Sequence, residues 1–196
     1  MPSAPATVVR GDGYSFRPMQ TGDAGPLSAV AADERYWRYL SDGPRSPEQV
    51  TAFVDDAVAR SADPASGHVW WAIEHPDTAV FLGTANLKRI GADQHRACSV
   101  GCALVPDAQG HGLGQRIGWA LIALAFDTFE MHRVECTCAV ENEASCHIMR
   151  DVFGMTYEGI RRDYKLTPRG WWSSHVFSIL EDEFAARDES LEARQI

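Results

Sequence analysis

The fold is decided by residues 99–126, which read SVGCALVPDAQGHGLGQRIGWALIALAF. The first seven of these residues form a short apolar run that predicts a β-strand, ended by the Pro106-Asp107 pair. Beyond the glycine-rich segment 109–114, apolar residues recur at helical spacing, at Ile117, Leu121, Leu124 and Ala125. Further apolar residues lie between them, so this helix should be buried. The predicted order is strand, glycine loop and buried helix.

The glycine loop 109–114 is suited to binding an anion. Glycine lets backbone N–H groups come close to a negative charge at a helix N-terminus, where the helix dipole favours it. A dinucleotide fingerprint, G-x-G-x-x-G, fails at Gln115, and the Gly-Lys-Ser/Thr of a Walker loop is absent. The remaining pattern is Q-x-x-G-x-G, formed by Gln109, Gly112 and Gly114. An ordinary glycine-rich turn between strand and helix is the alternative.

Composition narrows the class of protein. The chain has 196 residues, with 18 basic and 27 acidic side chains and a net charge of -9. One domain is expected at this length. The acidic balance argues against a nucleic-acid partner, because proteins that bind nucleic acid carry a basic stripe. No apolar run reaches the roughly 20 residues of a membrane span, and residues 1–13 lack the apolar core of a signal peptide, so we expect a cytoplasmic protein.

The five cysteines are expected to be free thiols. An odd number in a chain without a secretion signal argues against a disulfide framework. Cys136-x-Cys138 is tighter than the spacing of zinc or redox pairs, so no metal site is expected. Cys98 and Cys102 could act as nucleophiles in a covalent route, but ordinary buried thiols are the better interpretation.

The remaining segments predict a mixed α/β architecture, with one sheet and helices on both of its faces. Strands are expected at residues 14–19, 69–74, 79–90, 97–105, 132–140, 155–161 and 172–180. Two helices follow the first strand, the second beginning at the Ser46-Pro47 cap, and Asn142 caps a helix after the fifth strand. We divide the chain into a flexible segment 1–13, a single domain 14–184 and a charged tail 185–196.

In these features the chain resembles the GNAT (Gcn5-related N-acetyltransferase) superfamily, and within it the Rim-type branch that includes ribosomal-protein N-terminal acetyltransferases. Its loop 109–114 is similar to the (Q/R)-x-x-G-x-(G/A) loop of that family. Residues 141–145, ENEAS, resemble its N-E-x-S segment, and residues 153–159, FGMTYEG, resemble its GF…EG exit. The resemblance implies the GNAT fold, with a central mixed, mostly antiparallel sheet.

The resemblance also implies acetyl-CoA as co-substrate. The strand at 97–105 would splay from the next one and bind the pantetheine arm, whose amides can add on like a strand. The loop would hold the pyrophosphate, and Asn142 would reach the pantetheine. The implied cofactor-binding residues are Ala103, Leu104, Val105, Gln109, Gly110, His111, Gly112, Leu113, Gly114, Asn142 and Ser145. The simpler interpretation of His111 is an exposed loop histidine, and that of Asn142 is a helix cap.

The implied chemistry is direct acetyl transfer to an amine in a ternary complex. The amine must lose a proton, the oxyanion must be stabilised and the CoA thiolate must be reprotonated. A backbone N–H near Leu104 or Val105 is the expected oxyanion donor. Ser145 resembles the residue proposed as the acid in some Rim-type enzymes, although a serine satisfied by the helix backbone is a simpler role.

The general base is not evident from the sequence. Many relatives carry a glutamate on the central strand where this chain has Ser99. The candidate substitutes are Glu135, His95 or a distant carboxylate acting through water. The simpler role of Glu135 is that of a salt-bridged surface residue, and that of His95 is a loop histidine. Without a strong base, an α-amine with a pKa of about 8 is easier to deprotonate than a lysine with a pKa of about 10.4.

The acceptor pocket should lie between the first two helices and the last hairpin. Its candidate residues are Trp37, Tyr39, Tyr164, Trp171 and Trp172. The adjacent Trp171 and Trp172 cannot both face the core of a strand, so one should be exposed or line the pocket. The acidic total favours a cationic acceptor such as an aminoglycoside, a polyamine or a peptide N-terminus. By analogy with Rim-type proteins, a homodimer is also expected to be possible.

Two classes of function are therefore predicted. The first is an N-acetyltransferase for the primary amine of a small molecule such as an antibiotic, amino acid or other metabolite, with a protein N-terminus as a variant. The second is a non-catalytic acyl-CoA-binding module of the same fold, in which Ser99 marks the loss of the base. The loop together with Asn142 and Ser145 favours the enzyme.

Overall fold

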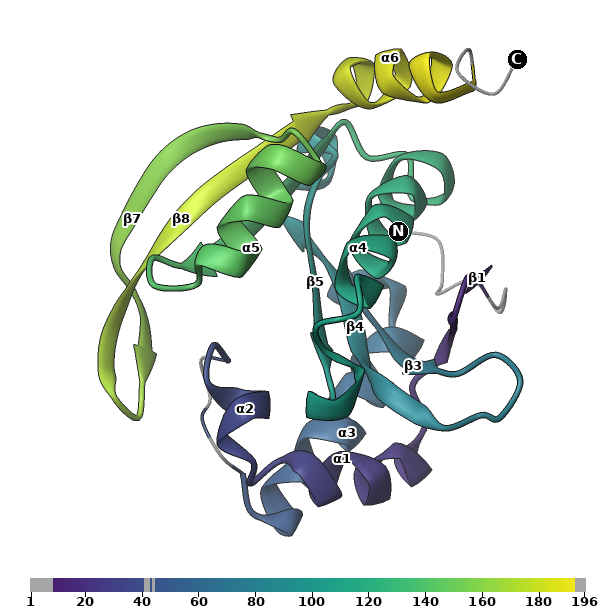
Figure 1. The fold of residues 1–196 in the computed structure, drawn as a ribbon, viewed down its shortest axis with the longest axis vertical. Coiled ribbons are helices and arrows are strands. Elements are labelled where there is room, and N and C mark those ends of the chain that lie inside the picture. The colour runs from purple at the N-terminus through teal and green to yellow at the C-terminus, as the bar shows by residue number, and fades with distance from the viewer. Residues whose placement is uncertain (1–8, 41–42, 44, 193–196) are drawn as a thin grey trace.

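An eight-stranded sheet runs through the molecule in the order β1-β2-β3-β4-β5-β6-β8-β7 (Figure 1). The computed structural model describes residues 9–40, 43 and 45–192. The strands are β1 (Val9–Gly11), β2 (Tyr14–Pro18), β3 (His68–Glu74), β4 (Phe81–Ile90), β5 (Ala97–Leu104), β6 (Arg133–Ala139), β7 (Thr156–Thr167) and β8 (Gly170–Leu180). Neighbouring strands are antiparallel except β5 and β6, which are parallel. The predicted mixed, mostly antiparallel sheet is confirmed.

Helices cover both faces of this sheet (Figure 1). They are α1 (Ala24–Val30), α2 (Glu34–Trp37), α3 (Pro47–Ala62), α4 (Leu113–Ala123), α5 (Glu143–His147) and α6 (Glu181–Glu192). Trp70 and Trp71 are neighbours on β3 and point to opposite faces of the sheet, because side chains alternate along a strand. Trp70 packs with the cluster of α1 and α3, whereas Trp71 lies in the larger cluster with α4. None of the described helices is long and apolar enough to cross a membrane.

The start of α3 shows how directly local chemistry sets an element boundary. Ser46 Oγ accepts a hydrogen bond from the Gln49 N–H, and Gln49 Oε1 accepts one from the Ser46 N–H. Pro47 occupies the first helical position, where its missing N–H costs nothing. The buried stripe of the helix is Val50, Val54 and Ala57. The predicted cap is confirmed.

Three predicted boundaries differ from the structure. Val9–Gly11, assigned to a flexible segment, forms β1 and pairs with β2, and a strand this short shows no alternation in the sequence. β7 extends to Thr167 instead of residue 161, because its register is interrupted between Arg161 and Lys165 and its exposed edge residues hide the pattern. The last helix, α6, begins at Glu181, so the predicted boundary at residue 184 falls inside it.

The parallel strands β5 and β6 separate part-way along their length. Their pairing covers only Ala97–Ser99 and Arg133–Glu135, although β5 continues to Leu104 and β6 to Ala139. Beyond the strands, α4 and the segment that follows α5 stay close together, since a Cβ on Gly118 of α4 would approach the ring of Phe153 to 2.4 Å. We call the space between the unpaired parts of β5 and β6 the fork. It exposes backbone groups of both strands inside an otherwise continuous sheet.

Candidate active site

The glycine loop leads from β5 into α4 through two left-handed residues. Gly110 and Gly112 have φ angles of 82° and 72°, and Gly112 is the N-cap of α4. L-residues rarely adopt this region, which explains glycine at both positions. A Cβ on Gly110 would meet no atom within 4 Å, so the outer side of the loop is open. The first two N–H groups of α4, those of Leu113 and Gly114, have no partners within the helix and remain available to an anion, whereas the Gln115 N–H donates to the Gly112 carbonyl at 3.2 Å.

Only alternate residues of β5 offer their backbone to the fork. The Val105 N–H donates to the Leu82 carbonyl at 2.8 Å, and the Ala103 carbonyl lies against Gly83, so both face β4. Leu104 lies between them and faces the fork, because backbone groups alternate along a strand. Of the two predicted oxyanion donors, Leu104 therefore has the required orientation and Val105 does not. Gln109 Nε2 donates to the Leu104 carbonyl at 2.9 Å and ties the loop to this strand end.

Arg116 adds a positive charge beside the loop that the sequence analysis missed. Its Nη1 atom lies 3.7 Å from the position that a Cβ on Gly112 would occupy. Its Nε donates to the Asp12 carbonyl at 3.1 Å, which holds the side chain in place. The helix dipole disfavours a cation in the first turn of a helix. That unfavourable placement, directly after the glycine motif, is the signal that could have identified Arg116.

The start of α5 holds a capped helix end and an uncommitted hydroxyl. Asn142 Oδ1 accepts a hydrogen bond from the Ser145 N–H at 3.2 Å, so the cap interpretation of Asn142 is confirmed. Its Nδ2 remains for a further bond, and the predicted contact with pantetheine stays a prediction. The half-buried Ser145 hydroxyl forms no hydrogen bond to the part of the chain that the structure describes. This hydroxyl is available to a substrate.

The cysteines gather on β5, β6 and α5 as free thiols. Burial raises the pKa of Cys98 to about 12, so its thiol stays protonated and is a poor nucleophile. Cys102, expected to be buried, is exposed, because β5 has already left β6 at that point. The sulfur atoms of Cys138 and Cys146 are 3.1 Å apart.

The two candidate bases occupy very different places. Glu135 is only 5 % exposed, and its carboxylate pairs with Arg161 at 2.8 Å and with Arg133 at 3.4 Å. It is in register with Ser99, one strand away from the position of the missing glutamate. His95 lies in the exposed turn before β5, at the end where β5 and β6 are paired. At about 3.3 Å per residue, the open end of the fork is more than roughly 20 Å away, so the structure does not bring His95 to Ser145.

The predicted acceptor aromatics are joined by an arginine that the sequence analysis missed. Arg169, in the turn between β7 and β8, lies 5.1 Å from the Trp37 ring and 4.9 Å from the Trp172 ring. Its Nη2 donates to the Arg38 carbonyl at the end of α2. This contact connects α2 with the β7–β8 hairpin, on opposite sides of the fork. We call the space that these elements border the acceptor mouth.

The other predicted aromatics lie at the edge of the mouth or outside it. Tyr164 is 45 % exposed, with the Arg161 guanidinium 4.9 Å from its ring. Tyr39 follows α2 and is also exposed. Trp171 is 61 % exposed and points to the opposite face of β8 from Trp172. The expectation that the two tryptophans differ is confirmed, and Trp171 is the one that leaves the mouth.

Comparison with known proteins gives a consistent result. The acetyltransferase (GNAT) domain family matches residues 15–155. An uncharacterized N-acetyltransferase of Bacillus subtilis (strain 168), YnaD, is 27% identical over 165 residues, which cover 78% of this chain and 85% of that protein. A GCN5-related N-acetyltransferase from Brucella melitensis has a TM-score of 0.80 at 19% identity, covering 98% of this chain and 86% of the other.

A second similar structure contains coenzyme A. RimL, a ribosomal L7/L12 alpha-N-protein acetyltransferase in complex with coenzyme A, has a TM-score of 0.77 at 17% identity, covering 90% of this chain and 99% of RimL. These structures share the overall fold, and the family match covers the glycine loop and the start of α5. The chain therefore belongs to the GNAT family, and it is an N-acetyltransferase that uses acetyl-CoA.

Proposed function

We propose that this acetyltransferase transfers the acetyl group to the primary amine of a small molecule, directly and within a ternary complex. The observation that carries the proposal is the Arg169 contact between Trp37 and Trp172, which bridges the outer end of the acceptor mouth. A protein N-terminus entering as an extended chain needs an open-ended groove, whereas a small molecule fits behind such a bridge. The acceptor amine would meet the thioester at the fork.

In the proposed reaction each group has a defined task. The amine nitrogen attacks the thioester carbonyl carbon, the carbon–sulfur bond breaks, and the nitrogen loses its proton to solvent. The N–H groups of residues 109–114 would hold the pyrophosphate, and the fork-facing Leu104 N–H would stabilise the oxyanion. Ser145 would donate a proton to the departing thiolate and regain one from solvent, which replaces the proton that the amine released. Both carboxylate oxygens of Glu135 already bind Arg161. Glu135 would therefore hold Arg161 in position as its ionic partner.

Thermal unfolding with ligands tests the donor first. A ligand present at about 100 times its dissociation constant adds roughly 2.7 kcal/mol of stability, which for a domain of this size raises the melting temperature by roughly 5–10 °C. We expect that shift with acetyl-CoA and none with NADPH, whose phosphates control for nonspecific anion binding. Absence of a shift with any CoA ester would remove the cofactor assignment of the loop.

Ser145→Ala tests the proposed acid. A thiol has a pKa of about 8.5 and leaves readily as the thiolate, so losing the acid should cost only about tenfold in kcat. The KM for acetyl-CoA should stay within about twofold, because the serine would act after binding. Steady-state release of the CoA thiol with an accepted amine measures both values. An unchanged kcat would exclude Ser145 as the acid, and a large rise in KM alone would assign it to binding.

A further inference from the structure

Positive side chains line one wall of the acceptor mouth, although the chain as a whole has a net charge of -9. Arg161 pairs with Ser174 and Lys165 pairs with Trp172 in the register of β7 and β8. Both cations therefore lie on the face of the hairpin that carries Trp172, the face turned toward the mouth. Arg169 follows in the connecting turn and contacts Trp172 from there. We call Arg161, Lys165 and Arg169 the basic strip.

The basic strip runs from the fork to the outer end of the mouth. At the inner end, Arg161 binds Glu135, which stands in register with Ser99, the last paired residue of β5. At the outer end, Arg169 reaches Trp37 on α2. An acceptor bound between the hairpin and α2 would therefore pass these cations on its way to the fork.

The three cations of the strip differ in how their charge is balanced. The guanidinium of Arg161 is neutralised by Glu135, with contacts of 2.8 and 2.9 Å. Lys165 and Arg169 have no carboxylate within salt-bridge distance among the described residues. The Lys165 amine lies 5.9 Å from the Tyr164 ring, and Arg169 lies between two indoles. Aromatic faces attract cations but supply no countercharge, so two positive charges remain at the wall of the mouth.

We propose that the acceptor carries an anionic group, a carboxylate or a phosphate, besides its amine, and that Lys165 and Arg169 bind this group. The inference rests on the proposed function, whose acceptor site it specifies. It reverses the cationic acceptor expected from the acidic composition, because the charge at the mouth differs from the charge of the whole chain. A planar guanidinium suits a carboxylate or phosphate, and a lysine amine adds a point charge beside it.

Matched amines that differ only in their anionic group test the proposal. The pairs are amino acids against their amides and phosphoethanolamine against ethanolamine, measured by release of the CoA thiol from acetyl-CoA. We expect the anionic member of at least one pair to have a KM about tenfold lower at low salt. This advantage should shrink as the ionic strength rises, because salt screens exposed charges. The preferred pair then distinguishes a carboxylate from a phosphate.

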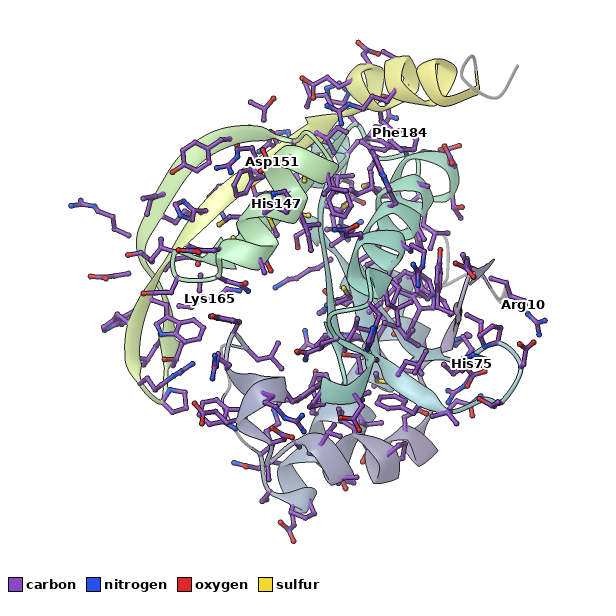
Figure 2. All side chains as sticks on the ribbon, in the orientation of Figure 1. Arg10, His75, His147, Asp151, Lys165 and Phe184 are labelled. Carbon is purple, nitrogen blue, oxygen red and sulfur yellow. The ribbon has the colours of Figure 1, made fainter. Side chains whose placement is uncertain are left out.

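Charge-removing variants assign the effect to residues. Lys165→Gln should raise the KM of the anionic acceptor severalfold and leave that of its neutral partner nearly unchanged, with little change in kcat. Arg169→Gln also removes the bridge to Trp37, so it should raise the KM of both acceptors, and that of the anionic acceptor more. Arg10→Gln is the matched control, because Arg10 is exposed on β1 at the opposite edge of the sheet from Lys165 (Figure 2). Equal KM values within every pair, or a preference for cationic amines, would overturn the inference and leave the acetyltransferase assignment intact.

A binding measurement covers the case in which no tested amine is turned over. Tryptophan fluorescence should respond to ligands at Trp37 and Trp172, so the N-acetylated amino acids and their amides can be titrated directly. Tighter binding of the acids, lost in Lys165→Gln, supports the inference. Equal binding, or none for either member, overturns it. Failure of acetyl-CoA to bind in the unfolding experiment would instead remove the proposed function itself.

Discussion

Replacing Gly112 with aspartate should lower the affinity for acetyl-CoA about a hundredfold. The residue caps α4 with a φ angle of 72°, a conformation that aspartate tolerates better than most residues. The main effect is therefore electrostatic, since the carboxylate would stand at the helix end that is proposed to hold the pyrophosphate. Two like charges roughly 5 Å apart repel by about 3 kcal/mol at an effective dielectric constant of about 20, and each 1.4 kcal/mol corresponds to a factor of about ten in affinity.

Gly112→Asn separates the effect of the added charge on affinity from the effect of the side chain's shape. Asparagine has nearly the same size as aspartate and also tolerates the left-handed region, but it is neutral. It should cost only a few-fold in affinity. Gly22→Asp adds the same charge at an exposed site with no neighbour within 4 Å of a Cβ, and it should leave binding unchanged. Titration with acetyl-CoA gives all three constants, and parental affinity in Gly112→Asp would show that the loop does not hold the cofactor.

Features built from neighbours in the sequence were predictable. The Ser46 cap, the Asn142 cap and the glycine loop between strand and helix each depend on a few adjacent residues, and the structure has all of them. The order of the elements followed from hydrophobic periodicity in the same way. Local patterns contain enough information for such features because the interactions that form them are local as well.

Features that depend on distant contacts were not predictable. The sequence of β5 continues past Ser99 as a regular strand, so its separation from β6 was expected only from the family resemblance, and the three-dimensional pairing confirms it. Arg169 reaches the Arg38 carbonyl across 131 residues, so no local pattern could connect it to Trp37. The choice of Leu104 over Val105 as oxyanion donor likewise follows from the bond that Val105 makes with Leu82. Composition did not indicate the charge of the acceptor mouth, because a total charge does not say where the charged side chains lie.

The largest effect on stability is expected for Trp71→Ala. Trp71 is fully buried at the centre of β3, with the Phe16 ring 6.3 Å away and the Phe129 ring 6.2 Å away. Removing a buried tryptophan side chain costs about 3–5 kcal/mol in the free energy of unfolding, out of a total that is typically about 5–15 kcal/mol. Trp171→Ala is the matched control, because that indole is 61 % exposed and should change stability by less than about 0.5 kcal/mol. Urea unfolding measures both.

Trp71→Phe distinguishes packing from polarity at the same position. The buried Trp71 Nε1 has no hydrogen-bond partner in the described part of the chain, and an unsatisfied buried donor costs about 1–3 kcal/mol. Phenylalanine removes this donor while keeping an aromatic ring against Phe16 and Phe129, so the lost volume is partly offset. We expect Trp71→Phe to cost less than half as much as Trp71→Ala. If Trp71→Phe costs as much stability as Trp71→Ala, the indole N–H has a hydrogen-bond partner in solution, because removing the donor then brings no gain.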